Sequence, residues 1–251
     1  MYSASRILRA FWWLMFGKSW QRRRVRHECA RFAASLFGDY PVSDDYKLWR
    51  EDKEFIGQYK NLCPGNYFTQ DRKFTLREFI RTTKDIPGAL VECGCWEGAS
   101  AWFIANELPE STFYIFDSFE GLSCPGKEDK SNLLDHQPWK QGDMAVTEQR
   151  LRSTLNEFKN IRILKGWIPN RFEEVAQERF RFVHIDVDLY KPTYASLEFF
   201  YPRMNPGGII VLDDYGSTIC PGAYKAAEEF MIDKPEYIIN LPTSQGIIIK
   251  K

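Results

Sequence analysis

From Gly88 onward the chain alternates short apolar runs with longer amphipathic segments, and this alternation constrains the fold more than any other feature. The apolar runs have the length of buried strands, and the segments between them have the length and periodicity of helices. Strands that alternate with helices form βαβ units, which make neighbouring strands parallel. The pattern predicts strands at 89–93, 112–117, 161–164, 182–186, 208–212, 237–240 and 246–250, with helices at 74–83, 98–108, 146–158, 194–203 and 224–231 and a helical turn at 172–177.

The last two predicted strands have no helix between them. Only residues 242–245 separate their apolar runs, which is too short for a crossover, so the two strands form a hairpin. The final strand then runs antiparallel at the edge of an otherwise parallel sheet. We therefore predict an α/β fold with a Rossmann-like sheet of the methyltransferase type, preceded by an N-terminal helical cap.

The beginning of the chain is strongly basic. Residues 1–27 contain seven Lys and Arg residues and no acid, whereas the whole chain has 34 basic and 34 acidic residues. This overall balance argues against nucleic acid as a partner. Residues 6–26 also contain five aromatic residues, a combination typical of a helix that lies peripherally on an anionic membrane surface. The alternative is a helix that packs on the domain or on a partner subunit of a homo-oligomer.

Two further features bear on the location of the protein. The longest apolar stretch, residues 10–17, is too short to span a bilayer, and no signal-peptidase-like site follows it. The six cysteines match no zinc-binding spacing, so we expect free thiols in a reducing compartment. These features predict a cytoplasmic protein, with peripheral contact to the inner face of the membrane as an option for the arm.

Ligands of open parallel sheets bind beyond the carboxyl ends of the strands. The segment 92–98, which follows the first strand, contains Gly94 for close backbone approach and Gly98 at the start of a helix. Its two acids would repel a pyrophosphate and favour a sulfonium or ammonium group. Asp117 follows the second strand, where an acid can bind ribose hydroxyls. S-adenosylmethionine fits both features; the alternatives are a structural turn at 92–98 and a cap or turn role for Asp117.

Carboxylates also follow two later strands. Asp186 and Asp188 end the fourth strand, and Asp213 and Asp214 end the fifth. Unpaired carboxylates that converge on one point need a cation, and oxygen ligands select Mg²⁺ first, then Ca²⁺ or Mn²⁺. The alternative is a set of helix caps and turn acids. His184, two residues before Asp186 inside the strand, is expected to be a core histidine and not a ligand.

Four separated segments carry a family resemblance: residues 85–98, 116–122, 184–190 with Thr193, and 201–215. In order and spacing they resemble the macrocin O-methyltransferase family, whose members methylate sugar hydroxyls of macrolide antibiotics with S-adenosylmethionine and Mg²⁺. The resemblance runs from about Asp71 to the C-terminus and excludes the basic arm. It departs at Val187, where the family has glycine.

Resemblance and loop chemistry together imply an S-adenosylmethionine-dependent, Mg²⁺-assisted O-methyltransferase that acts on a hydroxyl of a sugar or glycoside. Alternatives are a catechol-like enzyme for a phenolic diol and a non-catalytic scaffold. The implied organisation is a basic aromatic arm over residues 1–40, a helical cap over 41–87 and a methyltransferase domain over 88–251.

The implied site residues fall into three groups. The candidate cofactor-binding residues are Glu92, Gly94, Cys95, Gly98, Ser100, Asp117, Ser118, Gly166 and Trp167. The candidate metal ligands are Asp186, Asp213 and Asp214. Asp188 is the first candidate for the general base, and His136, in a loop at 133–139, is the second.

Overall fold

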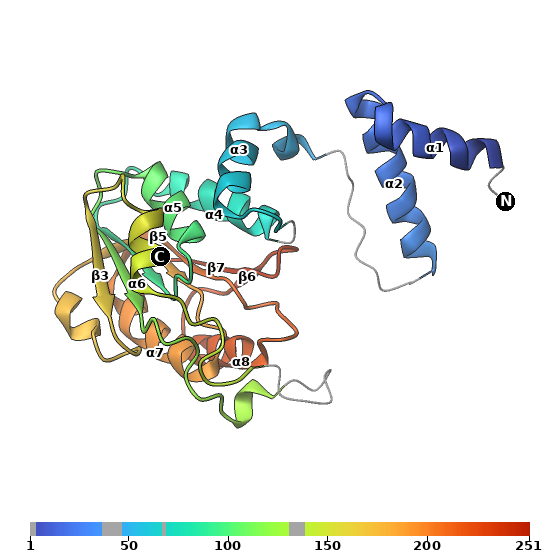
Figure 1. Cartoon of the computed structure of the whole chain (residues 1–251). Coiled ribbons are helices and arrows are strands. Elements are labelled where there is room, and N and C mark those ends of the chain that lie inside the picture. Colours follow the sequence, from blue (N-terminus) through green and yellow to red (C-terminus); the bar gives the residue numbers. More distant parts are fainter. Residues whose placement is uncertain (1–3, 37–46, 67–68, 131–138) are drawn as a thin grey trace. The chain divides into compact units, whose positions relative to one another are not determined.

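The computed structural model describes residues 4–36, 47–66, 69–130 and 139–251 (Figure 1). The chain forms two compact units, residues 1–58 and 59–251. No helix of the described ranges combines the length and the apolar character that crossing a membrane requires. The domain boundaries expected at residues 40 and 87 remain predictions of the sequence.

The first unit is helical. It contains α1 (Ala4–Phe16), α2 (Ser19–Leu36) and the beginning of α3 (Lys53–Leu62), which continues into the second unit. Gly17 ends α1: its N–H donates to the Trp13 carbonyl oxygen at 3.0 Å, and an added Cβ would lie 2.4 Å from that oxygen. The chain therefore turns sharply at Gly17 and α2 follows at once, with the Trp13 and Trp20 rings 5.9 Å apart.

The second unit contains a mixed sheet with helices on both sides. Its strands are β1 (Ala89–Cys93), β2 (Phe113–Asp117), β3 (Ile161–Lys165), β4 (Phe180–Ile185), β5 (Met204–Leu212), β6 (Ile239–Asn240) and β7 (Gly246–Ile249). Its further helices are α4 (Gln70–Thr82), α5 (Ala99–Glu107), α6 (Glu148–Thr154), α7 (Tyr190–Phe200) and α8 (Pro221–Met231).

The strand order is β3-β2-β1-β4-β5-β7-β6, with β7 antiparallel to both of its neighbours. The predicted fold class, a mostly parallel sheet with an antiparallel last strand, is thereby confirmed. The reversed strand differs from the prediction in its position, because β7 lies between β5 and β6 and not at the edge. A hairpin can place either of its strands against the sheet, and here β7, with its run of isoleucines, takes the buried position.

The register of the central strands positions the site. Cys93, Ile185 and Leu212 are paired across β1, β4 and β5, and each is the last residue of its strand. The residues that follow these three therefore leave the sheet at one edge.

Helices cover both faces of the sheet (Figure 1), and each face has its own hydrophobic layer. On one face, residues of α4, α5 and α6 pack against β1, β4 and β5 through Leu76, Ile104, Leu151, Leu90, Phe182 and Val211. On the other face, α7 and α8 pack through Leu197, Phe200, Ala227, Val91, Val183 and Ile210. Alternate residues of each strand thus face opposite layers, as buried strands require.

Four helices differ by three or more residues from their predicted ranges. Two of them begin earlier: α4 at Gln70 instead of residue 74, and α8 at Pro221 instead of residue 224. Helix α7 also begins earlier, at Tyr190 instead of residue 194. Pro192 does not prevent the earlier start, because it lies in the first helical turn, where an N–H would have no intrahelical partner. The helix predicted at 146–158 is limited to α6. Thr147 caps its N-terminus by accepting a hydrogen bond from the Arg150 N–H at 3.3 Å.

The long connection between β2 and α6 is tied to the C-terminal helices by Asp129. This buried carboxylate accepts hydrogen bonds from the N–H groups of Tyr190 at 2.8 Å and Gly126 at 2.7 Å. Gly222, in the first turn of α8, lies against the same group: an added Cβ would be 1.8 Å from Asp129 Oδ1 and 2.8 Å from the Tyr190 nitrogen. The close approach of α8 to this contact therefore requires glycine.

Gly222→Ala should lower the free energy of unfolding by about 1–3 kcal/mol, because the new methyl group has no space against the Tyr190 backbone. Gly57→Ala is the matched control, since Gly57 is also helical and nothing lies within 4 Å of its added Cβ. That change should raise the stability by roughly 0.5–1 kcal/mol. Denaturant unfolding of both variants measures the difference, and a stabilising Gly222→Ala would contradict the close packing.

Candidate active site

A pocket of about 620 Å³, counted with its opening to solvent, lies beyond the carboxyl ends of β1 to β4. Eight of the residues singled out in the sequence line it: Gly94, Cys95, Asp117, Ser118, Gly166, Trp167, Asp186 and Asp188. The pocket therefore joins the loops that follow four neighbouring strands.

Gly94 brings the ends of β1 and β4 together. Its φ is +77°, and an added Cβ would lie 2.0 Å from the carbonyl oxygen of Asp186. Its N–H donates to the Phe116 carbonyl oxygen at 2.9 Å, which joins the end of β2 to the same point. Only glycine can occupy this position, so Gly94 holds three strand ends close to the pocket.

Asp117 connects the loops that follow β1 and β2. Its Oδ2 accepts a hydrogen bond from the Cys95 N–H at 2.9 Å, and its Oδ1 accepts one from the Phe119 N–H at 2.7 Å. The thiol of Cys95 also lies 3.3 Å from Oδ2. These donors fix the orientation of a carboxylate that lines the pocket.

Ser118 and Gly166 shape the adjoining wall. The Ser118 hydroxyl donates to the Gly121 carbonyl oxygen at 3.1 Å and accepts from the Glu120 N–H at 3.0 Å, which closes a tight turn. The Gly166 N–H donates to the Asp117 carbonyl oxygen at 2.9 Å. The loops after β2 and β3 are thus bonded to each other where they face the pocket.

Three of the residues expected at the cofactor do not line the pocket. Glu92 is completely buried, because it lies inside β1 and its side chain faces His184. The N–H of Gly98 donates to the Cys95 carbonyl oxygen at 2.7 Å, so it is not available to a ligand. Ser100 is buried within α5. Their positions next to the loop in sequence do not bring them to the pocket surface.

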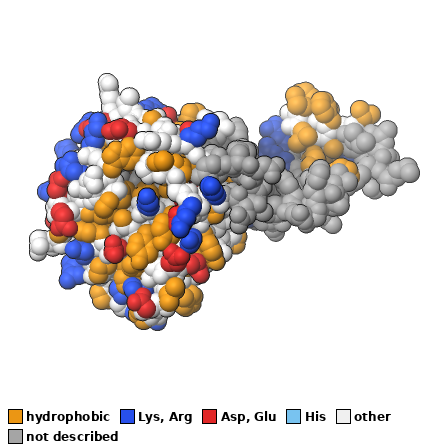
Figure 2. Space-filling model, turned by 90° about the horizontal axis from the view of Figure 1, so that it is seen from below, with side chains coloured by type: hydrophobic (Ala, Val, Ile, Leu, Met, Phe, Trp, Pro, Cys, Tyr) orange, Lys and Arg blue, Asp and Glu red, His pale blue; other side chains and the backbone are white. Residues whose placement is uncertain are grey.

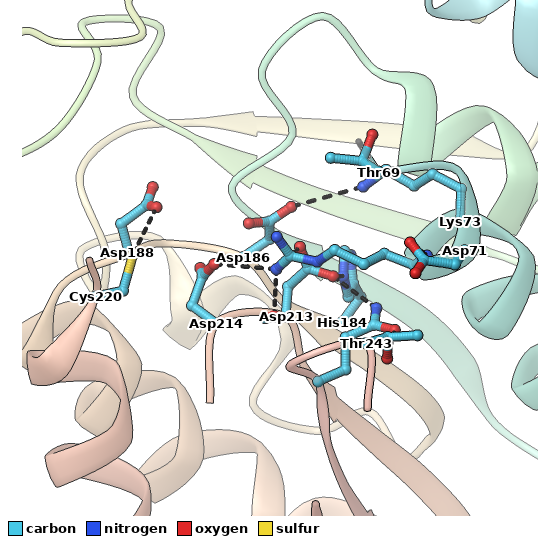
Figure 3. Close-up of polar contacts among 12 residues, drawn as sticks. Thr69, Asp71, Lys73, His184, Asp186, Asp188, Asp213, Asp214, Cys220 and Thr243 are labelled. Atoms are coloured by element: carbon cyan, nitrogen blue, oxygen red, sulfur yellow. Dashed lines mark hydrogen bonds and ion pairs between the residues drawn. The ribbon is translucent and has the colours of Figure 1, made fainter. Parts of the chain in front are cut away.

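The structure places the four strand-end aspartates in two neighbouring pairs (Figure 3). Oxygens of Asp186 and Asp213 lie within 4.8 Å of each other, as do oxygens of Asp188 and Asp214. Asp213 and Asp214 are buried, whereas Asp186 and Asp188 are partly exposed and form part of the pocket wall. The carboxylate cluster and the pocket are therefore adjacent.

Asp188 sits in an unusual backbone conformation. Its φ is +59°, and the Leu189 N–H donates to the Val187 carbonyl oxygen at 2.6 Å, which closes a three-residue turn around it. Its Oδ1 lies 3.4 Å from the Cys220 thiol. Burial, with a further contribution from the charge of Asp186, raises the pKa of Asp188 to about 7.

Arg72 and Lys73 enter the carboxylate cluster from α4. Arg72 Nη2 lies 2.5 Å from Asp213 Oδ2 and 3.0 Å from Asp214 Oδ1, and it also contacts the Asp213 carbonyl oxygen. Lys73 Nζ lies 3.9 Å from Asp186 Oδ2. Burial alone would raise the pKa of Asp213, but Lys73 and Arg72 outweigh it and hold that pKa well below its ordinary value.

These two cations were not singled out in the sequence. A signal was present, because Leu76 and Ile80 form the buried stripe of α4, and residues 72 and 73 precede them at helical spacing. A basic residue on a buried stripe indicates a buried acidic partner. The identity of that partner depends on how the helix crosses the sheet, which a single sequence does not contain.

His184 links two of the acids across the sheet. It is fully buried; its Nδ1 lies 2.9 Å from Glu92 Oε1 and its Nε2 lies 3.3 Å from Asp213 Oδ1. Burial alone would lower its pKa, but the hydrogen bonds with Asp213 and Glu92 outweigh burial and raise the pKa of His184 to about 9. Gln245 Nε2 also donates to Asp213 Oδ1, at 2.7 Å. Both ring nitrogens of His184 thus face carboxylates.

The charges of the cluster do not balance. The carboxylates are Glu92, Asp186, Asp188, Asp213 and Asp214, and the cationic groups are Arg72, Lys73 and His184. With all of them ionised, two negative charges remain. Among the described residues, the buried Oδ2 of Asp214 has no hydrogen-bond partner. Burial and the neighbouring Asp188 and Asp186 raise the pKa of Asp214 well above its ordinary value. An excess of oxygen donors and negative charge fits a divalent hard cation.

His136, the second candidate base, lies outside the described residues. Trp139, just after that segment, donates from Nε1 to the carbonyl oxygen of Ile219 at 3.0 Å. This bond ties the end of the loop to the residues that precede α8.

Comparison with known proteins relates the chain to a family. Residues 69–237 match the model of the macrocin O-methyltransferase family. Demethyldecarbamoylnovobiocin O-methyltransferase of Streptomyces niveus is 26% identical over 159 residues, which cover 58% of this chain and 59% of that protein. A tetracenomycin-C 4'-O-methyltransferase of Streptomyces olivaceus is 30% identical over 152 residues, which cover 55% and 57%. The chain thus matches less than two thirds of the length of these relatives.

Solved structures share the fold. A calicheamicin methyltransferase superposes with a TM-score of 0.65 at 18% identity, covering 88% of this chain and 91% of that one. The O-methyltransferase NovP gives 0.60 at 21% identity, covering 91% and 99%. At these identities the likeness concerns the fold alone. The family match, however, covers well over half of the chain and includes all four motifs. The chain belongs to the macrocin O-methyltransferase family.

Proposed function

We propose that the chain is an S-adenosylmethionine-dependent, Mg²⁺-assisted O-methyltransferase that acts on a hydroxyl of a sugar or glycoside. The observation that carries the proposal is the shared wall of the pocket. Asp117, Asp186 and Asp188 all line this one pocket, so a nucleoside cofactor and an acidic reaction centre would meet in one cavity.

The cofactor would occupy the part of the pocket formed by the loops after β1 to β3. Gly94 and Cys95 would face its methionine part, and Asp117 would accept hydrogen bonds from the ribose hydroxyls. The adenine would lie near Ser118 and the Gly166–Trp167 turn. Glu92 supports the site indirectly, because its carboxylate is engaged with His184.

Asp186, Asp213 and Asp214 would hold the Mg²⁺ ion. When bound, the ion would lower the pKa of the acceptor hydroxyl and orient it towards the methyl group. Arg72 contacts two of these three carboxylates. Its guanidinium holds the Asp213 and Asp214 carboxylates next to each other, and it must share them with the cation or shift.

Asp188 would accept the proton of the acceptor hydroxyl. It lines the pocket next to Asp186, and the turn around it directs the chain away from the strand. In this step the hydroxyl oxygen forms a bond to the methyl carbon, the bond between that carbon and the sulfur of S-adenosylmethionine breaks, and the hydroxyl proton passes to the Asp188 carboxylate. His136 remains the second candidate for this role.

The sugar acceptor is supported by the names of similar proteins. The full name of the tetracenomycin enzyme includes a dimethoxy-rhamnosyl group, and one solved structure is described as a TDP-rhamnose 3'-O-methyltransferase. A phenolic diol acceptor and a non-catalytic scaffold are the competing readings. Cytoplasmic location, self-association and membrane contact through residues 6–26 remain predictions of the sequence, and methyl transfer requires none of them.

Methyl transfer from labelled S-adenosylmethionine to a panel of sugar diols and catechols, with and without chelator, tests the proposal directly. We expect transfer to a sugar hydroxyl that chelator abolishes and Mg²⁺ restores, with much of the cofactor affinity retained in chelator. Transfer only to catechols would select the phenolic acceptor. Full activity in excess chelator would exclude a required metal, and cofactor binding without transfer to any acceptor would favour the scaffold.

Asp117→Ala should weaken cofactor binding by roughly 1.5–3 kcal/mol, the scale of a charge-assisted hydrogen bond lost in a pocket. Glu120→Ala is the matched control, because Glu120 is an exposed acid of the same loop that does not line the pocket. Titration calorimetry measures both. Thermal unfolding accompanies it, since the alanine also removes the acceptor of the Cys95 and Phe119 N–H groups. Unchanged affinity in Asp117→Ala would remove the ribose role.

Asp188→Asn and Asp186→Asn should fail in different ways. Loss of a general base lowers turnover by about 100- to 10,000-fold, so Asp188→Asn should show this loss with nearly unchanged Mg²⁺ and cofactor affinity. Asp186→Asn should instead raise the Mg²⁺ concentration that half-maximal turnover requires. Kinetics at varied Mg²⁺, with direct metal titration, separate the two. If Asp188→Asn loses Mg²⁺ affinity as severely as Asp186→Asn, or keeps near-normal turnover, His136 becomes the candidate base.

A further inference from the structure

Helix α1 exposes a continuous apolar face. Leu8, Phe11, Trp12, Met15 and Phe16 are 70%, 66%, 57%, 56% and 69% exposed. Their spacing places them on one side of the helix, and the Trp12 and Phe16 rings lie 6.0 Å apart. Single exposed apolar residues are common, but a contiguous group of large ones marks an interaction surface. We refer to these five side chains as the docking face.

The other side of α1 is already engaged. The Trp13 ring lies 5.9 Å from the Trp20 ring of α2, and the Arg9 guanidinium lies 5.4 Å from the centre of the Trp13 ring. Gly17 and Val25 are buried in the same helix pair. The contact between α1 and α2 therefore uses the Trp13 side and leaves the docking face outward.

The charged side chains of residues 1–27 have a single sign. Six of the seven Lys and Arg residues before Glu28 lie in α1 and α2, and Lys18 lies between the two helices; the first 27 residues contain no acid. Arg9, Lys18, Arg22, Arg24 and Arg26 have exposed side chains. Figure 2 shows hydrophobic and basic side chains among the described residues of this part of the molecule. Such a surface is complementary to a negatively charged partner.

We propose that α1 and α2 form a peripheral docking surface for an anionic lipid membrane. Tryptophan and phenylalanine insert into the boundary between headgroups and acyl chains, while neighbouring arginines bind anionic headgroups. The 13 residues of α1 give a length of about 20 Å, and spanning a bilayer takes about 20 residues, so α1 lies in the plane of the interface. The proposal stands independently of the methyl-transfer proposal, because it concerns the first unit alone.

Sedimentation of the full chain with vesicles tests it. We expect binding to phosphatidylcholine vesicles that contain about 30% phosphatidylserine, weak binding to phosphatidylcholine alone, and release at high salt. Phe11→Ser with Met15→Ser should lower the affinity for anionic vesicles at least tenfold, since two large apolar side chains no longer leave water. Arg24→Gln with Arg26→Gln should lower it roughly tenfold or more.

Matched controls lie in the second unit. Ile232 and Tyr237 are 83% and 75% exposed, so Ile232→Ser with Tyr237→Ser removes comparable apolar surface. Lys127→Gln with Lys159→Gln removes two exposed charges. Both control variants should bind vesicles like the unchanged protein.

Three outcomes would overturn the proposal. The first is no preference of the unchanged protein for anionic over neutral vesicles. The second is equal loss of binding in the control and docking-face variants. The third is a protein that does not bind vesicles but sediments as a dimer in the ultracentrifuge, and as a monomer after Phe11→Ser with Met15→Ser. That result would assign the docking face to a second copy of the chain.

Discussion

Buried negative charge at one edge of the sheet is the constraint on which the site depends. An ionised carboxylate removed from water costs several kcal/mol unless other charges and hydrogen bonds compensate it. The central strands end in register, so the acids that follow them lie close together. Arg72 and Lys73 on one side and His184 within the sheet provide the compensation that makes the cluster compatible with folding. The remaining imbalance leaves the site suited to a further cation.

This constraint also explains the role of the helix before the sheet. Helix α4 contributes Leu76 and Ile80 to the core and Arg72 and Lys73 to the acids, so one helix supplies both packing and charge. The part of the chain that precedes the first strand is therefore as much a part of the site as the strand ends themselves.

Much of the second unit could be predicted from the sequence. The strands from Ala89 to Leu212 are short, apolar and bounded by turn residues, so period and length identify them without knowledge of the fold. The convergence of Asp186, Asp188, Asp213 and Asp214 follows from the rule that parallel strands end at one edge. Acidic residues directly after buried strands are a local signal with a global consequence.

Features that depend on side-chain direction or on contacts between distant segments could not be predicted in this way. Glu92 precedes Gly94 by two residues, yet its side chain is buried against His184 and does not line the pocket. The N–H of Gly98 is satisfied by a turn whose geometry the sequence does not state. The inner position of β7 depends on which strand of the hairpin buries more apolar surface against the sheet.

The contact between Arg72 and the two adjacent aspartates has a thermodynamic consequence. The same carboxylates hold α4 in place and would bind an incoming cation. The free energy of helix packing and the free energy of cation binding therefore depend on the same oxygens. Linkage then requires that occupancy of the site alter the free energy of local opening of α4. Amide hydrogen exchange in this helix would therefore report occupancy of the carboxylates, at a place in the chain more than 100 residues away from them.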